Sequence, residues 1–232
     1  MSIERSASAD HQTAPASTGQ GVRFLAVLDA DSTLIENEVI ELLAEEMGSL
    51  AEVAGITERA MQGELDFAES LRERVATLAG LRVDRIPVIA ARITLTRGLE
   101  ELIDGLHRRG SRIGVVSGGF HELLDPLASA LGLDHVRANR LAVADGRLTG
   151  GLDGPIIDAA AKAEALAEWA AEDGIPLSRT VAIGDGANDL EMMATAGLSV
   201  AFNAKPIVRR RADVVAGRVD LAGVLPLLGF VD

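Results

Sequence analysis

Short runs of apolar residues recur along the chain, separated by longer stretches in which apolar positions follow a helical spacing. Five of these runs are expected to be strands, at residues 24–29, 112–118, 180–185, 198–202 and 212–216. Their apolar side chains would face both sides of a sheet, which is typical of parallel strands covered by helices on each face. The pattern therefore predicts a doubly wound α/β fold.

The first two runs are separated by far more chain than the single crossover helix that two parallel strands require. Between them, three segments place apolar residues three and four positions apart, as an amphipathic helix does; these segments are residues 38–48, 67–80 and 83–93. We therefore expect an all-helical insert at 38–94, carried by an α/β core made of residues 21–37 and 95–232.

Two further segments have a clear local signature. Asp145 and Gly146 stand between alternating apolar positions, which predicts a β-hairpin over residues 141–154. Residues 1–20 offer almost no apolar surface and lack the features of a signal or transit peptide, so we expect a disordered tail there. No apolar run approaches the ~20 residues that a membrane-spanning helix needs.

Composition narrows the classes of partner. Hydrophobic residues make up 48% and charged residues 25% of the chain, as in a soluble globular protein. The formal net charge of -13 opposes non-specific binding to nucleic acid or to an anionic membrane, which leaves a small molecule as the expected partner. The absence of cysteine excludes disulfides and thiolate chemistry and is consistent with a cytoplasmic location.

Acidic side chains cluster where the predicted strands end. Asp29 and Asp31 follow the first run, and Asp185 and Asp189 follow the third. In open α/β sheets ligands bind outside the carboxyl ends of the strands, so these carboxylates should converge. A site that offers only oxygen ligands suits a hard, octahedral cation, which predicts Mg²⁺.

Two other features could complement an anionic ligand. Ser117 and Gly118 end the second run and begin a turn whose hydroxyl and backbone N–H groups could hold a phosphate. Lys162 lies in an alanine-rich helix, where by itself it is more typical of a solvated surface lysine. It matters for function only as a cation that could offset the acids and a phosphate.

Taken together, these residues resemble a known set of motifs. Four features occur in the order and spacing of the haloacid dehalogenase superfamily, and within it of the phosphoserine phosphatases: DADSTLIENE, SGGF, Lys162 and GDGANDLEMM. A lone pair of aspartates would be weak evidence, but the four together are specific. The resemblance extends from about residue 24 to 228 and implies a Rossmann-like core with a small helical cap.

The resemblance also implies roles for individual residues. Asp29 would be the nucleophile that forms an aspartyl-phosphate, and Asp31 the general acid and then the general base. Mg²⁺ would be held by the Asp29 carboxylate, the main-chain carbonyl of Asp31 and Asp185. The implied reaction is hydrolysis of O-phosphoserine to serine and phosphate, the last step of serine biosynthesis.

Substrate binding follows from the same resemblance. The phosphate would be bound by Ser117, Gly118, Lys162 and Asn188, while Asp189 would orient Lys162 or a water on the metal. In the cap, the resemblance assigns Glu38 to the substrate ammonium group and Arg74 to its carboxylate, with Met61 and Phe67 lining the pocket. Without the resemblance, Arg74 would be read as an ordinary charged residue on an exposed helix.

Several alternatives stay open from the sequence. The aspartyl-phosphate could be passed to another alcohol, or the substrate could be a different phosphomonoester. A catalytically silent binding module is disfavoured because a binder gains nothing from a repulsive nucleophile and acid. Alanine at position 30 replaces the bulkier apolar residue usual in the family, with little effect expected. We expect no amino-acid-sensing regulatory domain, and the oligomeric state, monomer or dimer, stays open.

Overall fold

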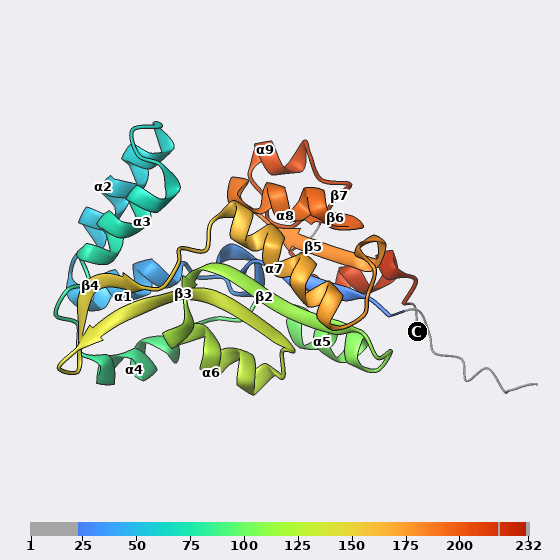
Figure 1. Cartoon of the computed structure of the whole chain (residues 1–232), viewed down its shortest axis with the longest axis horizontal. Coiled ribbons are helices and arrows are strands. Elements are labelled where there is room, and N and C mark those ends of the chain that lie inside the picture. Colours follow the sequence, from blue (N-terminus) through green and yellow to red (C-terminus); the bar gives the residue numbers. More distant parts are fainter. Residues whose placement is uncertain (1–22, 218, 231–232) are drawn as a thin grey trace, which may run out of the picture.

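The structure is a computed structural model that describes residues 23–217 and 219–230, and its centre is a seven-stranded sheet (Figure 1). The strand order is β4-β3-β2-β1-β5-β6-β7, and all neighbouring strands are parallel except β3 and β4. The strands are β1 (Leu25–Leu28), β2 (Arg112–Phe120), β3 (His135–Ala144), β4 (Arg147–Asp153), β5 (Thr180–Gly184), β6 (Leu198–Ala201) and β7 (Val214–Val215). The predicted α/β fold is confirmed, and each of the five apolar runs forms a strand.

Helices connect the strands and build the insert after β1. They are α1 (Val39–Met47), α2 (Leu50–Met61), α3 (Phe67–Ala76), α4 (Ile86–Ala90), α5 (Leu99–His107), α6 (His121–Leu131), α7 (Ala159–Glu172), α8 (Leu190–Thr195) and α9 (Pro206–Arg209). Short helical turns are η1 (Ala30–Leu34), η2 (Val83–Arg85), η3 (Leu177–Arg179), η4 (Ala187–Asp189) and η5 (Leu221–Leu228). The three helical segments predicted between residues 38 and 94 are confirmed, and α2 is an additional helix. The disordered tail predicted at 1–20 lies outside the described residues.

Alternation along β1 explains why helices cover both faces of the sheet. Ala26 and Leu28 belong to the apolar cluster that includes α5, α6 and η5, whereas Leu25 and Val27 belong to the cluster formed with α7, α8 and α9. Figure 1 shows α5 and α6 below the sheet and α7 and α8 above it. Every residue of β1 is fully buried, so the end of this strand is held rigidly between the two layers.

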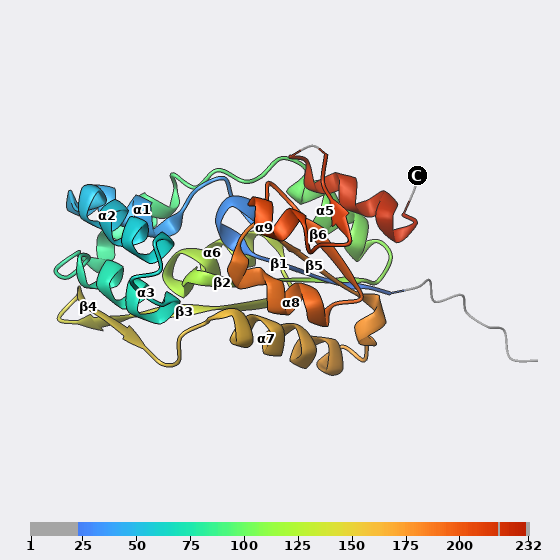
Figure 2. The ribbon, with the colours of Figure 1, turned by 90° about the horizontal axis from the view of Figure 1, so that it is seen from above.

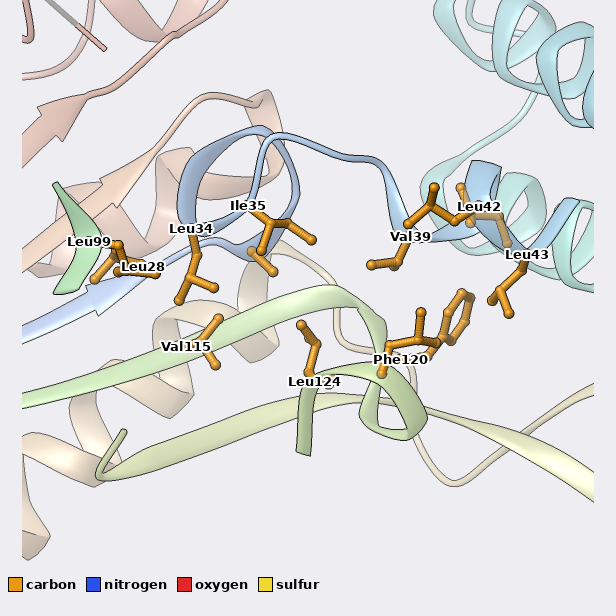
Figure 3. Packing of buried hydrophobic residues seen from close by; sticks show 14 of the residues in the cluster. Leu28, Leu34, Ile35, Val39, Leu42, Leu43, Leu99, Val115, Phe120 and Leu124 are labelled. Atoms are coloured by element: carbon orange, nitrogen blue, oxygen red, sulfur yellow. The ribbon is translucent and has the colours of Figure 1, made fainter. Parts of the chain in front are cut away.

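The larger apolar cluster continues from the sheet into the insert. Figure 3 shows it running from Leu28 through Leu34 and Ile35 of the turn after β1 to Val39 and Leu43 of α1. The first helix of the insert is therefore packed into the same core as the sheet. Among the described residues, no helix is both long enough and apolar enough to cross a bilayer.

Strand β3 has two different neighbours along its length. Its first half pairs in parallel with β2, and its second half forms the predicted antiparallel hairpin with β4. The strand begins at His135, six residues before the predicted hairpin starts. Charges obscure the strand pattern there, because His135 pairs with Asp173 and Arg137 pairs with Glu168 on the face that α7 covers.

The insert lies beyond the carboxyl ends of the central strands, with α3 beside β4 (Figure 2). Its two junctions with the core are adjacent, since Ile35 and Leu95 form an isolated antiparallel bridge. The backbone N–H of Glu36 also donates to the Thr94 carbonyl at 2.9 Å. The chain thus leaves and re-enters the core at one point.

Candidate active site

A pocket lies where the carboxyl ends of β1, β2 and β5 meet the insert. This is the position at which open α/β sheets bind ligands. The residues that line it are Asp29, Asp31, Glu38, Val39, Ile40, Phe67, Leu71, Arg74, Gly118, Gly119, Phe120, Asp185, Gly186, Asn188 and Lys205. Ser117, Lys162 and Asp189 are fully buried next to these residues. All predicted site residues except Met61 therefore gather at this end of the sheet.

Asp29 directly follows β1, and its carboxylate is held from two sides. Its Oδ1 atom accepts a hydrogen bond from the Ala30 N–H at 2.7 Å and lies 2.7 Å from the Lys162 ammonium nitrogen. The side chain is 8% exposed. Burial raises the pKa of Asp29 to about 7, and the neighbouring Asp189 carboxylate adds to this effect. The carboxylate is thus fixed in place but costly to ionise without a further cation.

The turn after Asp29 brings Asp31 into the same pocket. This turn passes through Ser32 with φ of 57°, a left-handed conformation that is uncommon for a residue with a side chain. The Asp31 Oδ1 atom accepts from the Val39 N–H at 3.3 Å. Burial, followed by the charges of Glu38 and Asp29, raises the pKa of Asp31 well above its ordinary value. Asp31 can therefore carry a proton at a pH where an exposed aspartate could not.

Lys162 is a buried centre of the site and not a solvated surface residue, which corrects the interpretation of this lysine taken by itself. Its ammonium nitrogen lies 2.7 Å from Asp29 Oδ1 and 2.7 Å from Asp189 Oδ1. Burial alone would lower the pKa of Lys162, but the two carboxylates raise it above its ordinary value. The small alanines around it allow this face of α7 to pack against the strand ends, so the lysine points inward and stays charged.

Asp189 organises the turn that follows β5. Its Oδ2 atom accepts from the Asp185 N–H at 3.1 Å and the Gly186 N–H at 2.9 Å, while Oδ1 accepts from Lys162 at 2.7 Å. A β-carbon at Gly184 would clash with the Asp189 carboxylate, which explains glycine at this position. Both oxygens of Asp189 are therefore engaged in holding the turn and the lysine.

Three carboxylates could hold a metal ion at this site. One oxygen from each of Asp29, Asp185 and Asp189 lies within 4.8 Å of the others. Burial raises the pKa of Asp185 to about 6, although Lys205, 3.9 Å away, opposes the shift. Hard oxygen ligands fit a divalent cation, and its charge would remove the cost of ionising Asp29 and Asp185.

The insert contributes the opposite wall of the pocket. The turn expected to begin at Ser117 and Gly118 is not formed, because β2 continues to Phe120 and α6 follows at His121. Phe67 begins α3 and lies over this end of β2, since its Cζ atom would be 3.1 Å from a β-carbon placed on Gly118. Glu38 accepts a hydrogen bond from the Ser32 hydroxyl at 3.0 Å. Arg74 is partly buried, and Glu38 and Asp31 are the acids that interact with it most strongly. An acid and a guanidinium group thus line the pocket on the side of the insert.

Met61 does not reach the pocket in this structure, contrary to the position expected for it. It is the last residue of α2 and is 82% exposed. The reason is the direction of α2 and α3, which extend away from the strand ends (Figure 1). An exposed methionine at the end of a helix is an apolar surface without a partner in this conformation.

Lys205 is a pocket residue that the sequence reasoning missed. Its backbone N–H donates to the Asp185 carbonyl at 2.9 Å, which anchors the segment after β6 to the site. The signal was available, because Lys205 follows the predicted strand at 198–202. The same rule that identified residues after the first three strands would have identified it if applied to the fourth.

Comparisons with known proteins agree with this geometry. The sequence profile of the haloacid dehalogenase-like hydrolase family matches residues 26–194. A phosphoserine phosphatase from Streptococcus thermophilus is 53% identical over 210 residues, covering 90% of this chain and 98% of the relative. One from Streptomyces coelicolor is 54% identical over 206 residues, 89% of this chain, but the match spans only 50% of that relative's length.

A solved structure described as a phospho-aspartyl intermediate analogue of phosphoserine phosphatase is also similar. It superposes with a TM-score of 0.83 at 44% identity, covering 89% of this chain and 99% of that one. The chain therefore belongs to the phosphoserine phosphatase family of haloacid dehalogenase-like hydrolases.

Proposed function

We propose that this chain hydrolyses O-phosphoserine to serine and inorganic phosphate, the last step of serine biosynthesis. One observation carries the proposal: the Asp29 carboxylate is held by buried Lys162 at 2.7 Å, in a pocket where Asp31 has a strongly raised pKa. A nucleophile beside a proton donor is the combination that cleavage of a phosphomonoester requires.

The mechanism has two displacements at phosphorus. In the first, an oxygen of Asp29 forms a bond to phosphorus as the bond to the serine oxygen breaks, and Asp31 gives its proton to that leaving oxygen. In the second, Asp31 takes a proton from water as the water oxygen attacks phosphorus, and the bond to Asp29 breaks. Phosphate leaves and both aspartates return to their starting state. In both steps, Lys162 and the donor groups of Ser117 and Gly118 stabilise the equatorial oxygens of the phosphoryl group.

We infer that the metal ion is Mg²⁺. The carboxylates of Asp29 and Asp185 and the main-chain carbonyl of Asp31 would hold it, since Asp189 already accepts hydrogen bonds at both oxygens. When bound, Mg²⁺ supplies positive charge that offsets the negative charge of the phosphoryl group and the surrounding acids.

Recognition of the serine part is assigned to the insert. Glu38 would pair with the substrate ammonium group and Arg74 with the carboxylate, while Phe67 covers Gly118 at the end of β2. Met61 would join them only if the end of α2 moved toward the core. Residues 38–94 would thus form the cap domain, with 21–37 and 95–232 as the core that performs the chemistry.

The other readings of the site are weaker. A binding module without catalysis does not explain why the carboxyl groups of Asp29, Asp31 and Asp185 line one pocket, because their negative charges would repel an anionic ligand. Transfer of the phosphoryl group to another alcohol would use the same first step. With a net charge of -13 and no cysteine, we expect a cytoplasmic enzyme whose partner is a small molecule rather than nucleic acid or membrane.

The direct test is release of phosphate from O-phospho-L-serine, compared with phosphothreonine, sugar phosphates and p-nitrophenyl phosphate. We expect phosphoserine to give the highest kcat/KM, with activity lost in a chelator and restored by Mg²⁺. Ca²⁺ should inhibit, because the larger ion can engage both oxygens of Asp29. A preference for a sugar phosphate, or full activity in the chelator, would contradict the proposed function.

A further inference from the structure

Asn139 is a buried polar residue at the point where β3 turns away from β2. It is 1% exposed and pairs in register with Phe120, after an irregularity in the ladder between the two strands. The bend leaves backbone N–H groups of β3 without a strand partner, and α6 supplies side chains instead. His121 Nε2 accepts from the Ala138 N–H at 3.1 Å, and Glu122 accepts from the Leu141 N–H at 3.3 Å. The side chain of Asn139 is thereby held facing the site.

The carboxamide of Asn139 makes one bond to each of two separate segments. Its Nδ2 atom donates to the Gly118 carbonyl at 2.8 Å, and its Oδ1 atom accepts from the Ile157 N–H at 2.9 Å. The partners fix which way the amide of Asn139 is turned. If the amide were reversed, its oxygen would face the Gly118 carbonyl and its NH2 group would face the Ile157 N–H. Only a side chain with one donor and one acceptor can satisfy both segments.

The bond to Gly118 fixes residues 117–119 near the end of β2, which would bind phosphate. Gly118 contributes the carbonyl, and Gly119 the N–H, of a single peptide group. Asn139 holds the carbonyl, and the Ser117 hydroxyl oxygen accepts from the Gly119 N–H at 2.8 Å. Both ends of that peptide are therefore fixed, and the Ser117 hydroxyl keeps a proton that it can donate to a ligand.

The bond to Ile157 fixes the start of α7. Ile157 directly precedes Asp158, whose side chain caps the helix by accepting from the Ala161 N–H at 2.9 Å. Lys162 follows one turn into this helix, where it contacts Asp29 and Asp189. A shift at Ile157 would therefore move the ammonium group relative to both carboxylates.

We propose that Asn139 is a positioning residue for the phosphate site. It sets the distance between the hydrogen-bond donors of residues 117–119 and the ammonium group of Lys162. Asn139 touches no reacting atom, and it acts through Gly118 on one side and Ile157 on the other. This inference rests on the proposed phosphatase function. Residues that orient ligand-binding groups in this way typically affect affinity or activity 10- to 100-fold, by analogy with the outer shell of metal sites.

The test compares Asn139→Leu with Thr180→Val, two substitutions that keep the branching of the side chain but remove its hydrogen-bonding groups. Thr180 is the matched control: it is 1% exposed, donates to the Leu177 carbonyl at 2.9 Å and accepts from the Gly197 N–H at 3.2 Å. It bridges two backbone groups at the amino end of β5, away from the pocket. We expect both variants to lower Tm, whereas only Asn139→Leu changes phosphate binding.

Three quantities are measured for each variant: Tm, the Kd of orthophosphate with Mg²⁺ by calorimetry, and kcat/KM for phosphoserine and p-nitrophenyl phosphate. Asn139→Leu should raise the phosphate Kd and lower kcat/KM by about 10- to 100-fold, by the same factor for both substrates. The equal factor is expected because both substrates share only the phosphate. Thr180→Val should leave these values near those of the wild type.

A second variant separates the two bonds of the amide. Asn139→Asp keeps an acceptor for Ile157 but loses the donor to Gly118 until the introduced carboxyl group is protonated. Its activity relative to the wild type should therefore rise as pH is lowered.

Equal effects of Asn139→Leu and Thr180→Val on phosphate Kd, or a loss confined to phosphoserine, would overturn the positioning role. If the wild type failed to hydrolyse phosphoserine, the proposed function would fall, and the comparison of phosphate Kd would still decide the role of Asn139.

Discussion

Asp29 and Lys162 depend on each other at the bottom of the pocket. A buried ammonium group without a partner would lose its charge, and a buried carboxylate would stay protonated. At 2.7 Å each favours the charged form of the other, although burial and Asp189 still raise the pKa of Asp29 to about 7. Asp189 contacts the lysine at the same distance. Removing the charge of Lys162 would leave both carboxylates without this cation and is expected to destabilise the fold by ~3–5 kcal/mol, whereas Asp29→Asn leaves Lys162 paired with Asp189.

Arg74 offers a residue-scale test of serine recognition. If it pairs with the substrate carboxylate in a closed pocket, Arg74→Ala should lower kcat/KM for phosphoserine by a factor that corresponds to about 2–4 kcal/mol of lost transition-state stabilisation. Phosphoethanolamine and p-nitrophenyl phosphate lack the carboxylate, so their turnover should barely change. The matched control is Arg72→Ala. Arg72 is an exposed arginine on the same helix, and its replacement should leave kcat/KM unchanged for both kinds of substrate.

The ratio between the two kinds of substrate is the informative measurement. A parallel loss on all substrates would show that Arg74 supports folding or movement of the insert instead. In that case the assignment of Arg74 to serine recognition would be wrong, although the phosphatase chemistry could stand. Glu38→Gln should likewise have its largest effect on substrates with an ammonium group.

The motifs predicted which residues gather, but not all of their environments. Asp29, Asp31 and Asp185 could be placed from sequence because each directly follows an apolar run, and strand ends converge. The burial of Lys162 could not, because it depends on where α7 lies against the sheet. Asn139 was also invisible, since the charged residues around it hide the strand and its two partners come from distant segments.

Helices and strands were predictable where burial of apolar side chains alone determined the local sequence pattern. The central strands are apolar on both faces, so their position was plain from the sequence. Helix α2 was not singled out because it buries only Val53 and Ile56 and has Gly55 between them. The first half of β3 was missed for a related reason: ion pairs replace apolar contacts on one face.

The amino ends of β2 and β3 carry an ionic link that can be tested at the scale of elements. Asp134 accepts from the Ile113 N–H at 2.9 Å, lies 2.9 Å from His107 of α5 and pairs with Arg112. Burial alone would raise the pKa of Asp134, but these partners together hold it below its ordinary value. Because its pKa is lower in the folded state, Asp134 stabilises the fold at pH values above its unfolded pKa of about 3.9. This contribution is lost as the pH falls through the folded pKa.

Asp134→Asn should therefore reduce the free energy of unfolding by ~1–3 kcal/mol at neutral pH. The difference from the wild type should shrink as pH falls below about 4, because the wild type then protonates Asp134 as well. Urea unfolding at a series of pH values measures it. Asp153→Asn, at an exposed position on β4, is the control and should stay within about 0.5 kcal/mol. A pH-independent difference for Asp134→Asn would contradict the ionic explanation.

At the scale of the whole molecule, the insert is joined to the core by both packing and chain geometry. The shared apolar cluster fixes α1 to the sheet (Figure 3). The bridge between Ile35 and Leu95 closes the two junctions. The part left to move is the outer end of α2 and α3, where Met61 is exposed. Movement of that end toward the strands would cover the pocket and exclude water from the reaction.

Closure can be tested through Met61 because the chain contains no cysteine. Met61→Cys introduces a single thiol at a position that is now 82% exposed. Its rate of labelling by a thiol reagent should fall several-fold when Mg²⁺ and a non-hydrolysable phosphonate analogue of phosphoserine are added. Leu177→Cys, 43% exposed near the amino end of β5, is the control and should label at the same rate with and without the analogue. An unchanged rate at position 61 would mean that the end of α2 does not close.

The central claim is that Asp29 becomes covalently phosphorylated during turnover. The direct measurement is to quench the reaction with phosphoserine in acid within the first turnover and to locate the phosphoryl group by peptide mass spectrometry. We predict one phosphoryl group on the peptide that contains Asp29, and none in Asp29→Asn, whose turnover should fall ~10³-fold or more while its fold is kept. A phosphoryl group on another residue, or near wild-type turnover in Asp29→Asn, would contradict the account.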